Sequence, residues 1–193
     1  MADLQDHVVS ARIATDAGKL LLDIRERLFG QGADSWTVKD TGDLEAHRFI
    51  MKALQEQFPS DGILSEEGRD DLSRLEKERV WIVDPLDGTR EFGEPGRSDW
   101  AVHIALTENG VPTAGAVALP AIGKTLTTDP ASKLSPAHEG RPRMVVSRSR
   151  APAAAMIVAE ALDAELLALG SAGAKAMAVV LGHADIYAHS GGQ

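Results

Sequence analysis

The chain of 193 residues contains no cysteine, which excludes disulfide bonds, thiol nucleophiles and cysteine-ligated zinc together. It also has no apolar run approaching the roughly 20 residues that a membrane span requires. The first residues lack a basic segment followed by an apolar one, so no signal peptide is expected. These absences predict a cytoplasmic protein without a membrane partner.

Positive charge is in the minority in this chain. The 29 acidic residues outnumber the 20 basic ones, which gives a formal net charge of -9 at pH 7. This balance argues against a nucleic-acid polymer or an anionic membrane as the main partner. It does not exclude an anionic substrate, because bound metal ions can reverse the local sign of charge.

Helical and strand patterns alternate loosely along the chain, which predicts a mixed α and β fold built in layers. Apolar residues at helical spacing predict a long helix over 8–28. A second helix is expected to begin with Asp43 as its N-cap and to end before Pro59, and a hairpin turn is expected at 108–110. Strands are expected at 63–64, 80–83, 100–106, 111–119, 144–147, 165–169 and 184–187, and further helices at 152–162 and 173–181.

The segment from Thr125 to Pro142 is rich in proline, serine and charge, and it predicts a loop or a mobile hairpin. We therefore expect an N-terminal α+β subdomain over 1–120 that contains a metal site. A loop over 121–142 is expected to join it to a C-terminal α/β subdomain over 143–193.

The strongest chemical signal lies between Trp81 and Glu91. An apolar run ends at Asp84, and Asp87 follows three residues later, with Pro85 and Gly88 in the same turn. Neighbouring carboxylates repel each other unless a cation holds them, and Mg²⁺ prefers oxygen ligands. The same composition is also typical of an ordinary turn without a metal.

Two further acidic positions strengthen the metal interpretation. Glu66 and Glu67 follow the apolar pair Ile63–Leu64, and Asp43 opens the expected second helix. Three acidic clusters, each beside an apolar segment or a helix start, favour a shared metal site, with the Leu86 carbonyl as a neutral ligand. Two ions at such a site can activate a water and stabilise a leaving oxygen in phosphoryl chemistry.

The hexapeptide Asp-Pro-Leu-Asp-Gly-Thr at 84–89, preceded by 81–83 and by Ser65-Glu66-Glu67, resembles the inositol monophosphatase superfamily. The resemblance covers nearly the whole chain and implies Mg²⁺-dependent, lithium-sensitive phosphatases with a layered α-β-α-β-α sugar-phosphatase fold. Within the superfamily, the segments 90–92 and 146–149 are similar to the CysQ-type 3'(2'),5'-bisphosphate nucleotidases.

The resemblance also implies roles for individual residues. Two or three Mg²⁺ ions would be bound by Glu66, Asp84, the Leu86 carbonyl and Asp87, and Li⁺ would inhibit. The residues implied to act on the nucleophilic water are Asp43, Glu66 and Thr89. The residues implied to contact substrate are Glu66, Leu86, Asp87, Gly88, Thr89, Arg90, Ser147, Arg148 and Lys175.

The remaining polar and aromatic candidates have weaker signals. Arg148 and Lys175 are candidates for a second phosphate, but each is also interpretable as a surface cation. His103 is expected to be a packed or exposed strand residue rather than a ligand. Asp185 is expected to anchor the last strand, and the tryptophans at 36 and 100 are expected to be packing groups.

The implied reaction is water attack on the 3'-phosphate of adenosine 3',5'-bisphosphate, giving AMP, as in sulfate assimilation. Alternatives are hydrolysis of inositol 1-monophosphate or fructose 1,6-bisphosphate, and a non-catalytic metal- or phosphate-binding fragment. The family pattern continues past the last strand into a Trp-Asp segment that supplies a ligand of the second metal. This sequence stops at Gln193, so we expect that part to be missing. The resemblance is compatible with a homodimer, but no apolar stripe in the sequence predicts an interface.

Overall fold

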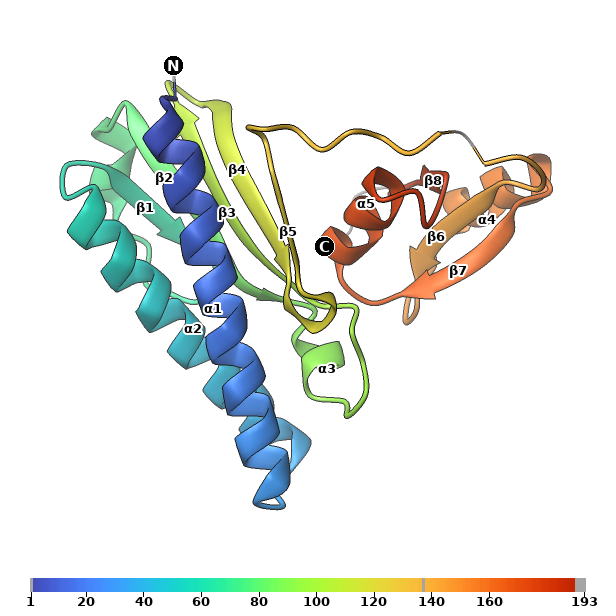
Figure 1. Cartoon of the computed structure of the whole chain (residues 1–193), viewed down its shortest axis with the longest axis horizontal. Coiled ribbons are helices and arrows are strands. Elements are labelled where there is room, and N and C mark those ends of the chain that lie inside the picture. Colours follow the sequence, from blue (N-terminus) through green and yellow to red (C-terminus); the bar gives the residue numbers. More distant parts are fainter. Residues whose placement is uncertain (1, 137, 190–193) are drawn as a thin grey trace.

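Two β-sheets organise residues 2–136 and 138–189, which the computed structural model describes (Figure 1). The first sheet has the strand order β1-β2-β3-β4-β5, and only β1 and β2 run parallel. The second has the order β7-β6-β8 and is parallel throughout. The first sheet consists of β1 (Gly62–Ser65), β2 (Arg79–Asp87), β3 (Ala101–Glu108), β4 (Val111–Leu119) and β5 (Lys124–Thr127), and the second of β6 (Arg143–Ser147), β7 (Glu165–Leu169) and β8 (Ile186–Tyr187).

Two long helices, α1 (Leu4–Gly30) and α2 (Ser35–Gln57), cover one face of the first sheet (Figure 1). The apolar stripe of α1, which includes Leu21, packs over β3 and β4, whereas that of α2, which includes Ile50, packs over β2. Asp3 begins α1 through a reciprocal capping box with Asp6, which satisfies two backbone N–H groups.

The second helix begins earlier than the sequence predicts. Asp34 is its N-cap and accepts the backbone N–H of Thr37, so the prediction of Asp43 as N-cap is wrong. Thr41 and Gly42, which precede the expected N-cap, also lie inside the helix. Gly42 is buried where a Cβ would lie 2.5 Å from the Phe92 ring, so close packing requires a glycine within this helix.

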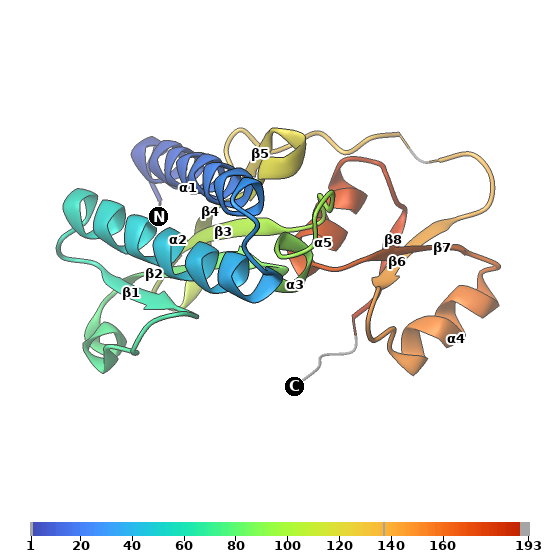
Figure 2. The ribbon, with the colours of Figure 1, turned by 90° about the horizontal axis from the view of Figure 1, so that it is seen from below.

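The remaining helices complete a five-layer arrangement. On the central strand β6, Met144 and Val146 pack against α4 (Ala153–Ala161), whereas Val145 packs on the opposite side, against α5 (Ala172–Val180). Helix α5 also contacts β3 and β4 of the first sheet, so it lies between the two sheets (Figure 2). The order of layers is α1 and α2, first sheet, α5, second sheet, α4, and the predicted α-β-α-β-α fold is confirmed.

The connections agree partly with the sequence predictions. The turn between β3 and β4 places Asn109 and Gly110 at positive φ, which confirms the predicted hairpin. Strand β5 pairs antiparallel with β4 over 124–127, so the first sheet extends into the segment predicted as a loop or a mobile hairpin. The described part of 128–142 has no helix or strand. The division into two subdomains at 120 and 143 stays a prediction.

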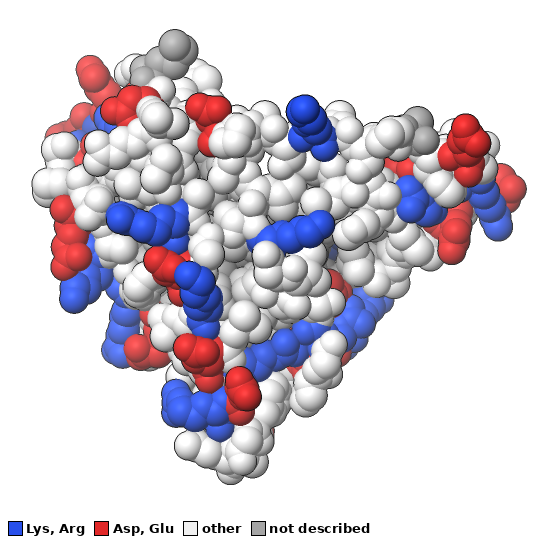
Figure 3. All heavy atoms as spheres, in the orientation of Figure 1, with Lys and Arg blue, Asp and Glu red and all other residues white. Residues whose placement is uncertain are grey.

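Three short helices lie in the connections of the first half: η1 (Leu72–Glu76), α3 (Thr89–Phe92) and η2 (Pro120–Ile122). Among the described helices, none is both long and apolar enough to cross a membrane. Basic and acidic side chains lie interspersed over the α1 face (Figure 3). The excess of negative charge is therefore not gathered into one acidic field on that face.

Candidate active site

The parallel pairing of β1 and β2 brings two acidic segments to one sheet edge. Ser65 pairs with Val83, and the Glu66 backbone N–H donates to the Val83 carbonyl at 3.2 Å. Because the carboxyl ends of parallel strands meet at the same edge, Glu66 and Asp84 both follow the last paired residues there. The sequence predicted this convergence from the two apolar runs.

The turn after Asp84 is held by its own hydrogen bonds. The Leu86 N–H donates to Asp84 Oδ1 at 3.1 Å, and the Thr89 hydroxyl donates to the Leu86 carbonyl at 3.1 Å. Gly88 has φ of +88°, a left-handed conformation that favours glycine. The register between β2 and β3 shifts between Asp84 and Asp87, so a bulge re-aims the end of the strand.

Asp87 is held by donors from two other elements. Its Oδ2 accepts from His103 Nε2 at 3.0 Å, from the Ser171 hydroxyl at 2.7 Å and from the Gly173 N–H at 2.6 Å. Its Oδ1 accepts from the Ala172 N–H at 3.2 Å. Burial by itself would raise the pKa of Asp87, but these hydrogen bonds and the His103 charge lower it to about 2.

Two other carboxyl groups have the opposite shift. Burial, with the charges of Asp87 and Glu66, raises the pKa of Asp84 to about 7. Burial, with the charges of Glu67, Asp84 and Glu66, raises the pKa of Asp43 to about 7. Burial first, and then the neighbouring negative charges, disfavour ionisation of both groups, and a bound cation would relieve the repulsion.

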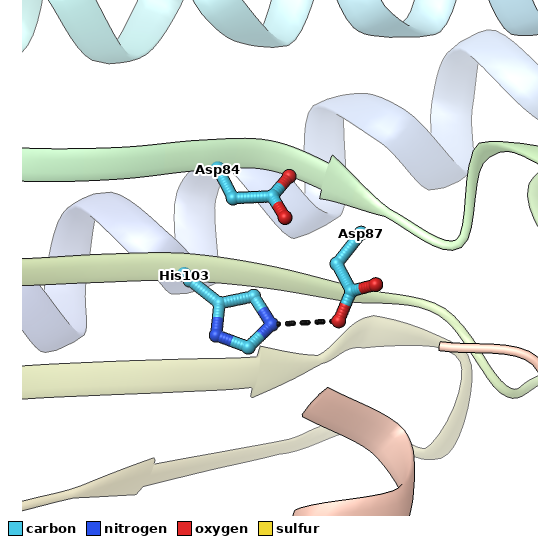
Figure 4. A group of neighbouring side chains, drawn as sticks. All are labelled: Asp84, Asp87 and His103. Carbon is cyan, nitrogen blue, oxygen red and sulfur yellow. Dashed lines mark hydrogen bonds and ion pairs between the residues drawn. The ribbon is translucent and has the colours of Figure 1, made fainter. Parts of the chain in front are cut away.

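The donor set fits a hard divalent cation. Asp84, Asp87 and His103 offer ligand atoms that lie within 4.8 Å of one another (Figure 4). Glu66 directly follows β1 and Leu86 lies in the last residues of β2, so both offer oxygen atoms at this edge, and oxygen ligands are those that Mg²⁺ prefers. The cluster can therefore hold a metal ion.

Asp43 and Thr89 meet at a cavity beside this cluster. The cavity has a volume of about 290 Å³ and is lined by Trp36, Lys39, Asp40, Asp43, Thr89 and Arg90. Trp36 is 68% exposed, so its expected packing role is wrong, whereas Trp100 is fully buried as expected. Two of the three residues predicted to act on the water, Asp43 and Thr89, thus share one cavity with the predicted substrate contact Arg90.

Three predicted substrate residues make contacts within the protein. Arg148 forms ion pairs with Glu91 at 2.7 Å and Glu94 at 2.8 Å. Lys175 is buried and donates to the carbonyls of residues 170 and 171 at 2.7 and 2.9 Å. The Ser147 hydroxyl accepts the backbone N–H of residue 150 at 3.2 Å. Their substrate roles, and those of Gly88 and Thr89, stay predictions.

Sequence reasoning missed the contribution of His103. It was expected to be an ordinary strand residue, but its ring contacts Asp87 because the antiparallel register sets His103 opposite Asp84. That register joins β2 to β3, which no predicted hairpin connects, so the sequence held no local signal for the contact. The anchoring role expected of Asp185 agrees with the structure, since its carboxylate accepts from the Arg143 backbone N–H at 2.8 Å.

Comparison with known proteins gives matches over the length of the chain. The inositol monophosphatase family matches residues 5–193. A Mycobacterium bovis protein named 3'-phosphoadenosine 5'-phosphate phosphatase is 49% identical over 187 residues, covering 92% of this chain and 69% of the relative. A Mycobacterium leprae protein of the same name is 45% identical, covering 100% of this chain and 74% of the relative.

Solved structures share the fold of this chain. CysQ from Bacteroides thetaiotaomicron superposes with a TM-score of 0.76 at 26% identity, over 95% of this chain and 79% of that one. Inositol monophosphatase II from Staphylococcus aureus has a TM-score of 0.75 at 20% identity, over 96% and 75%. The last residues, 191–193, after which we expect the Trp-Asp segment to be missing, lie outside the described residues. This chain belongs to the inositol monophosphatase family, as its Asp-Pro-Leu-Asp-Gly-Thr motif predicted.

Proposed function

We propose that this chain is a Mg²⁺-dependent phosphatase that removes the 3'-phosphate of adenosine 3',5'-bisphosphate and releases AMP. The observation that carries the proposal is the carboxylate cluster at the adjoining ends of β1 and β2, with Asp43 and Thr89 on a cavity beside it. The names of relatives at 45 to 49% identity support this substrate.

The proposed metal ligands are Glu66, Asp84, the Leu86 carbonyl and Asp87. When bound there, Mg²⁺ supplies positive charge that lowers the pKa of water and neutralises phosphate oxygens. Two or three ions and inhibition by Li⁺ are part of the proposal. Cytoplasmic location, a homodimer and the lack of a nucleic-acid polymer partner stay predictions.

Asp43 and Thr89 are proposed to orient the attacking water. The Thr89 hydroxyl already donates its hydrogen to the Leu86 carbonyl, so its free lone pair can accept a hydrogen bond from that water. Asp43 is proposed to take a proton from that water, because its carboxyl group lines the same cavity as Thr89. The backbone N–H groups at 88–89 are proposed to hold the reacting phosphate.

Phosphate release from three substrates tests this function. Adenosine 3',5'-bisphosphate, inositol 1-monophosphate and fructose 1,6-bisphosphate are compared with and without Mg²⁺. We expect the nucleotide to give the highest kcat/KM, and turnover to require the metal. Equal turnover of all three substrates would contradict a dedicated nucleotidase, and no turnover of any would contradict an active phosphatase.

A pair of variants in the same assay tests the site. Asp87→Asn removes a proposed ligand charge, and we expect most activity to disappear while the fold persists by circular dichroism. Asp16→Asn changes a surface carboxylate that pairs with Lys19, and it should retain full activity. Near-normal turnover by Asp87→Asn would show that the proposed ligand set is wrong.

A further inference from the structure

Asp87 is the point where three parts of the chain converge on one carboxylate. His103 comes from β3, whereas Ser171 and Gly173 come from the start of α5 in the middle layer. Figure 4 shows the His103 ring extending from its strand toward the Asp87 carboxylate, with Asp84 on the neighbouring strand. Among the described residues, the hydrogen bonds that orient the Asp87 carboxylate therefore come from β3 and α5 and not from its own turn.

The contact between His103 and α5 is close enough to fix the ring. A Cβ on Gly173 would lie 2.2 Å from His103 Nε2 and 3.0 Å from Asp87 Oδ2. Real side chains do not approach so closely, so the helix start meets the ring only because residue 173 is a glycine. The ring also borders a cavity of about 310 Å³ whose wall includes the apolar residues Met177 and Val180. Hydrogen bonds are stronger in such apolar surroundings than in water.

Hydrogen-bond chemistry distinguishes a supporting role for His103 from direct metal binding. The 3.0 Å contact between Nε2 and Asp87 Oδ2 needs one proton, and an ionised carboxylate has none to give. His103 therefore donates through Nε2, and a nitrogen that carries a proton has no lone pair for a metal. His103 Nε2 thus lies within reach of the acidic cluster, but its proton is used in the hydrogen bond that orients Asp87.

We propose that His103 is a positioning residue that orients the Asp87 carboxylate for metal binding. The inference rests on the proposed metal site and adds to it a residue outside the family motif. Hydrogen-bond partners of metal ligands commonly contribute about 10- to 100-fold to metal affinity, because they fix the ligand's orientation before the metal arrives. Loss of the His103 donor should therefore weaken metal binding without removing any ligand.

Direct binding of Mn²⁺ to the purified chain tests this role without substrate. Electron paramagnetic resonance of free Mn²⁺ gives the affinity, and competition with Mg²⁺ assigns the binding to the same site. We expect His103→Leu to weaken Mn²⁺ binding by about 10- to 100-fold. His103→Gln, which offers an N–H donor at a similar reach, should recover most of that affinity.

Controls separate positioning from folding. His7→Leu removes a comparable 2.9 Å contact between His7 and Thr128 and should leave Mn²⁺ affinity unchanged. Melting curves without metal should show that His103→Gln is folded. Equal Mn²⁺ affinity in His103→Leu and wild type would overturn the proposal, and so would a His103→Gln variant as weak as His103→Leu. If the wild-type chain itself bound no Mn²⁺, the metal assignment under the proposed function would fail first.

Gly173→Ala disturbs the contact between His103 and Asp87 through a change in α5. The added methyl group must displace the His103 ring, so we expect weaker Mn²⁺ binding in the wild-type background. Together with His103→Leu, the two changes should cost less than the sum of their separate effects, because both disrupt one contact. Fully additive losses would contradict a shared role in holding Asp87.

Discussion

Arg148 follows the central strand of the second sheet and contacts two glutamates of the first half of the chain. Its guanidinium bonds Glu91, which is only 5% exposed, and Glu94. A buried carboxylate that loses its cation is left without compensation, which is costly. These contacts indicate that Arg148 stabilises the fold, whereas the family resemblance implied that it binds substrate.

Replacing Arg148 distinguishes the two roles. Because its charge is already paired with Glu91 and Glu94, we expect Arg148→Ala to lower the melting temperature. It should also reduce kcat/KM by a similar factor for a bisphosphate and a monophosphate. Arg150→Ala, two residues along at an exposed position, serves as the control and should change neither quantity. A loss confined to the bisphosphate would instead support direct contact with the second phosphate.

At the scale of the element, the turn between β2 and α3 depends on one backbone conformation. Gly88 closes the motif at φ of +88°, and a Cβ there would lie 3.0 Å from the Ser171 side chain and 3.2 Å from the Asp99 carbonyl. Left-handed backbone alone costs a non-glycine residue about 1 to 2 kcal/mol. Position 88 therefore requires glycine for two reasons: the left-handed backbone and the lack of space for a Cβ.

Gly88→Ala should lower the free energy of unfolding by more than that conformational cost. Gly123→Ala is the matched control, since Gly123 also has positive φ, at +64°, but has open space where the Cβ would lie. Urea denaturation of both variants measures the difference, and Gly123→Ala should lose only about 1 to 2 kcal/mol. If the two variants lost the same amount, crowding at Gly88 would have no role.

At the scale of the whole molecule, a charged network connects the helix layer to the first sheet. Arg79 on β2 pairs with Asp6 of α1 at 2.6 Å, with Asp61 at 3.1 Å and with Glu108 at 3.3 Å. Burial by itself would raise the pKa of Asp6, but the hydrogen bonds from Arg79 and the Asp3 N–H lower it. The folded protein therefore stabilises the ionised form of Asp6 more than the unfolded chain does.

This network predicts how stability varies with pH. A lowered folded-state pKa stabilises the fold above the unfolded carboxyl pKa of about 3.9, and the contribution is lost as the pH falls through the folded value. Asp6→Asn should thus cost about 1 to 2 kcal/mol at neutral pH. Urea denaturation at a series of pH values should show this difference shrinking as the pH falls below the unfolded carboxyl pKa of about 3.9 and wild-type Asp6 becomes protonated. A difference that stayed constant with pH would exclude the charge as its cause.

Local patterns determined most of the elements and the chemical motif. Apolar periodicity predicted α1, the central strands and the hairpin at Asn109–Gly110, because these depend on neighbouring residues. The start of α2 was predicted wrongly, since Asp43 has the residue type of an N-cap, but the helix has Asp34 as its N-cap and continues through Gly42, which packs against Phe92. Strand β5 was missed, because its pairing with β4 outweighs a sequence that resembles a loop.

The sequence by itself determined the family, the layered fold and the carboxylates at 84 and 87, since a hexapeptide and a helix–strand pattern are local properties. Only the tertiary structure decided what holds Asp87 and what surrounds Arg148. The partners of Asp87 lie 16 to 86 residues away in the chain. Such contacts depend on strand register and on the close approach of α5, which no local pattern encodes.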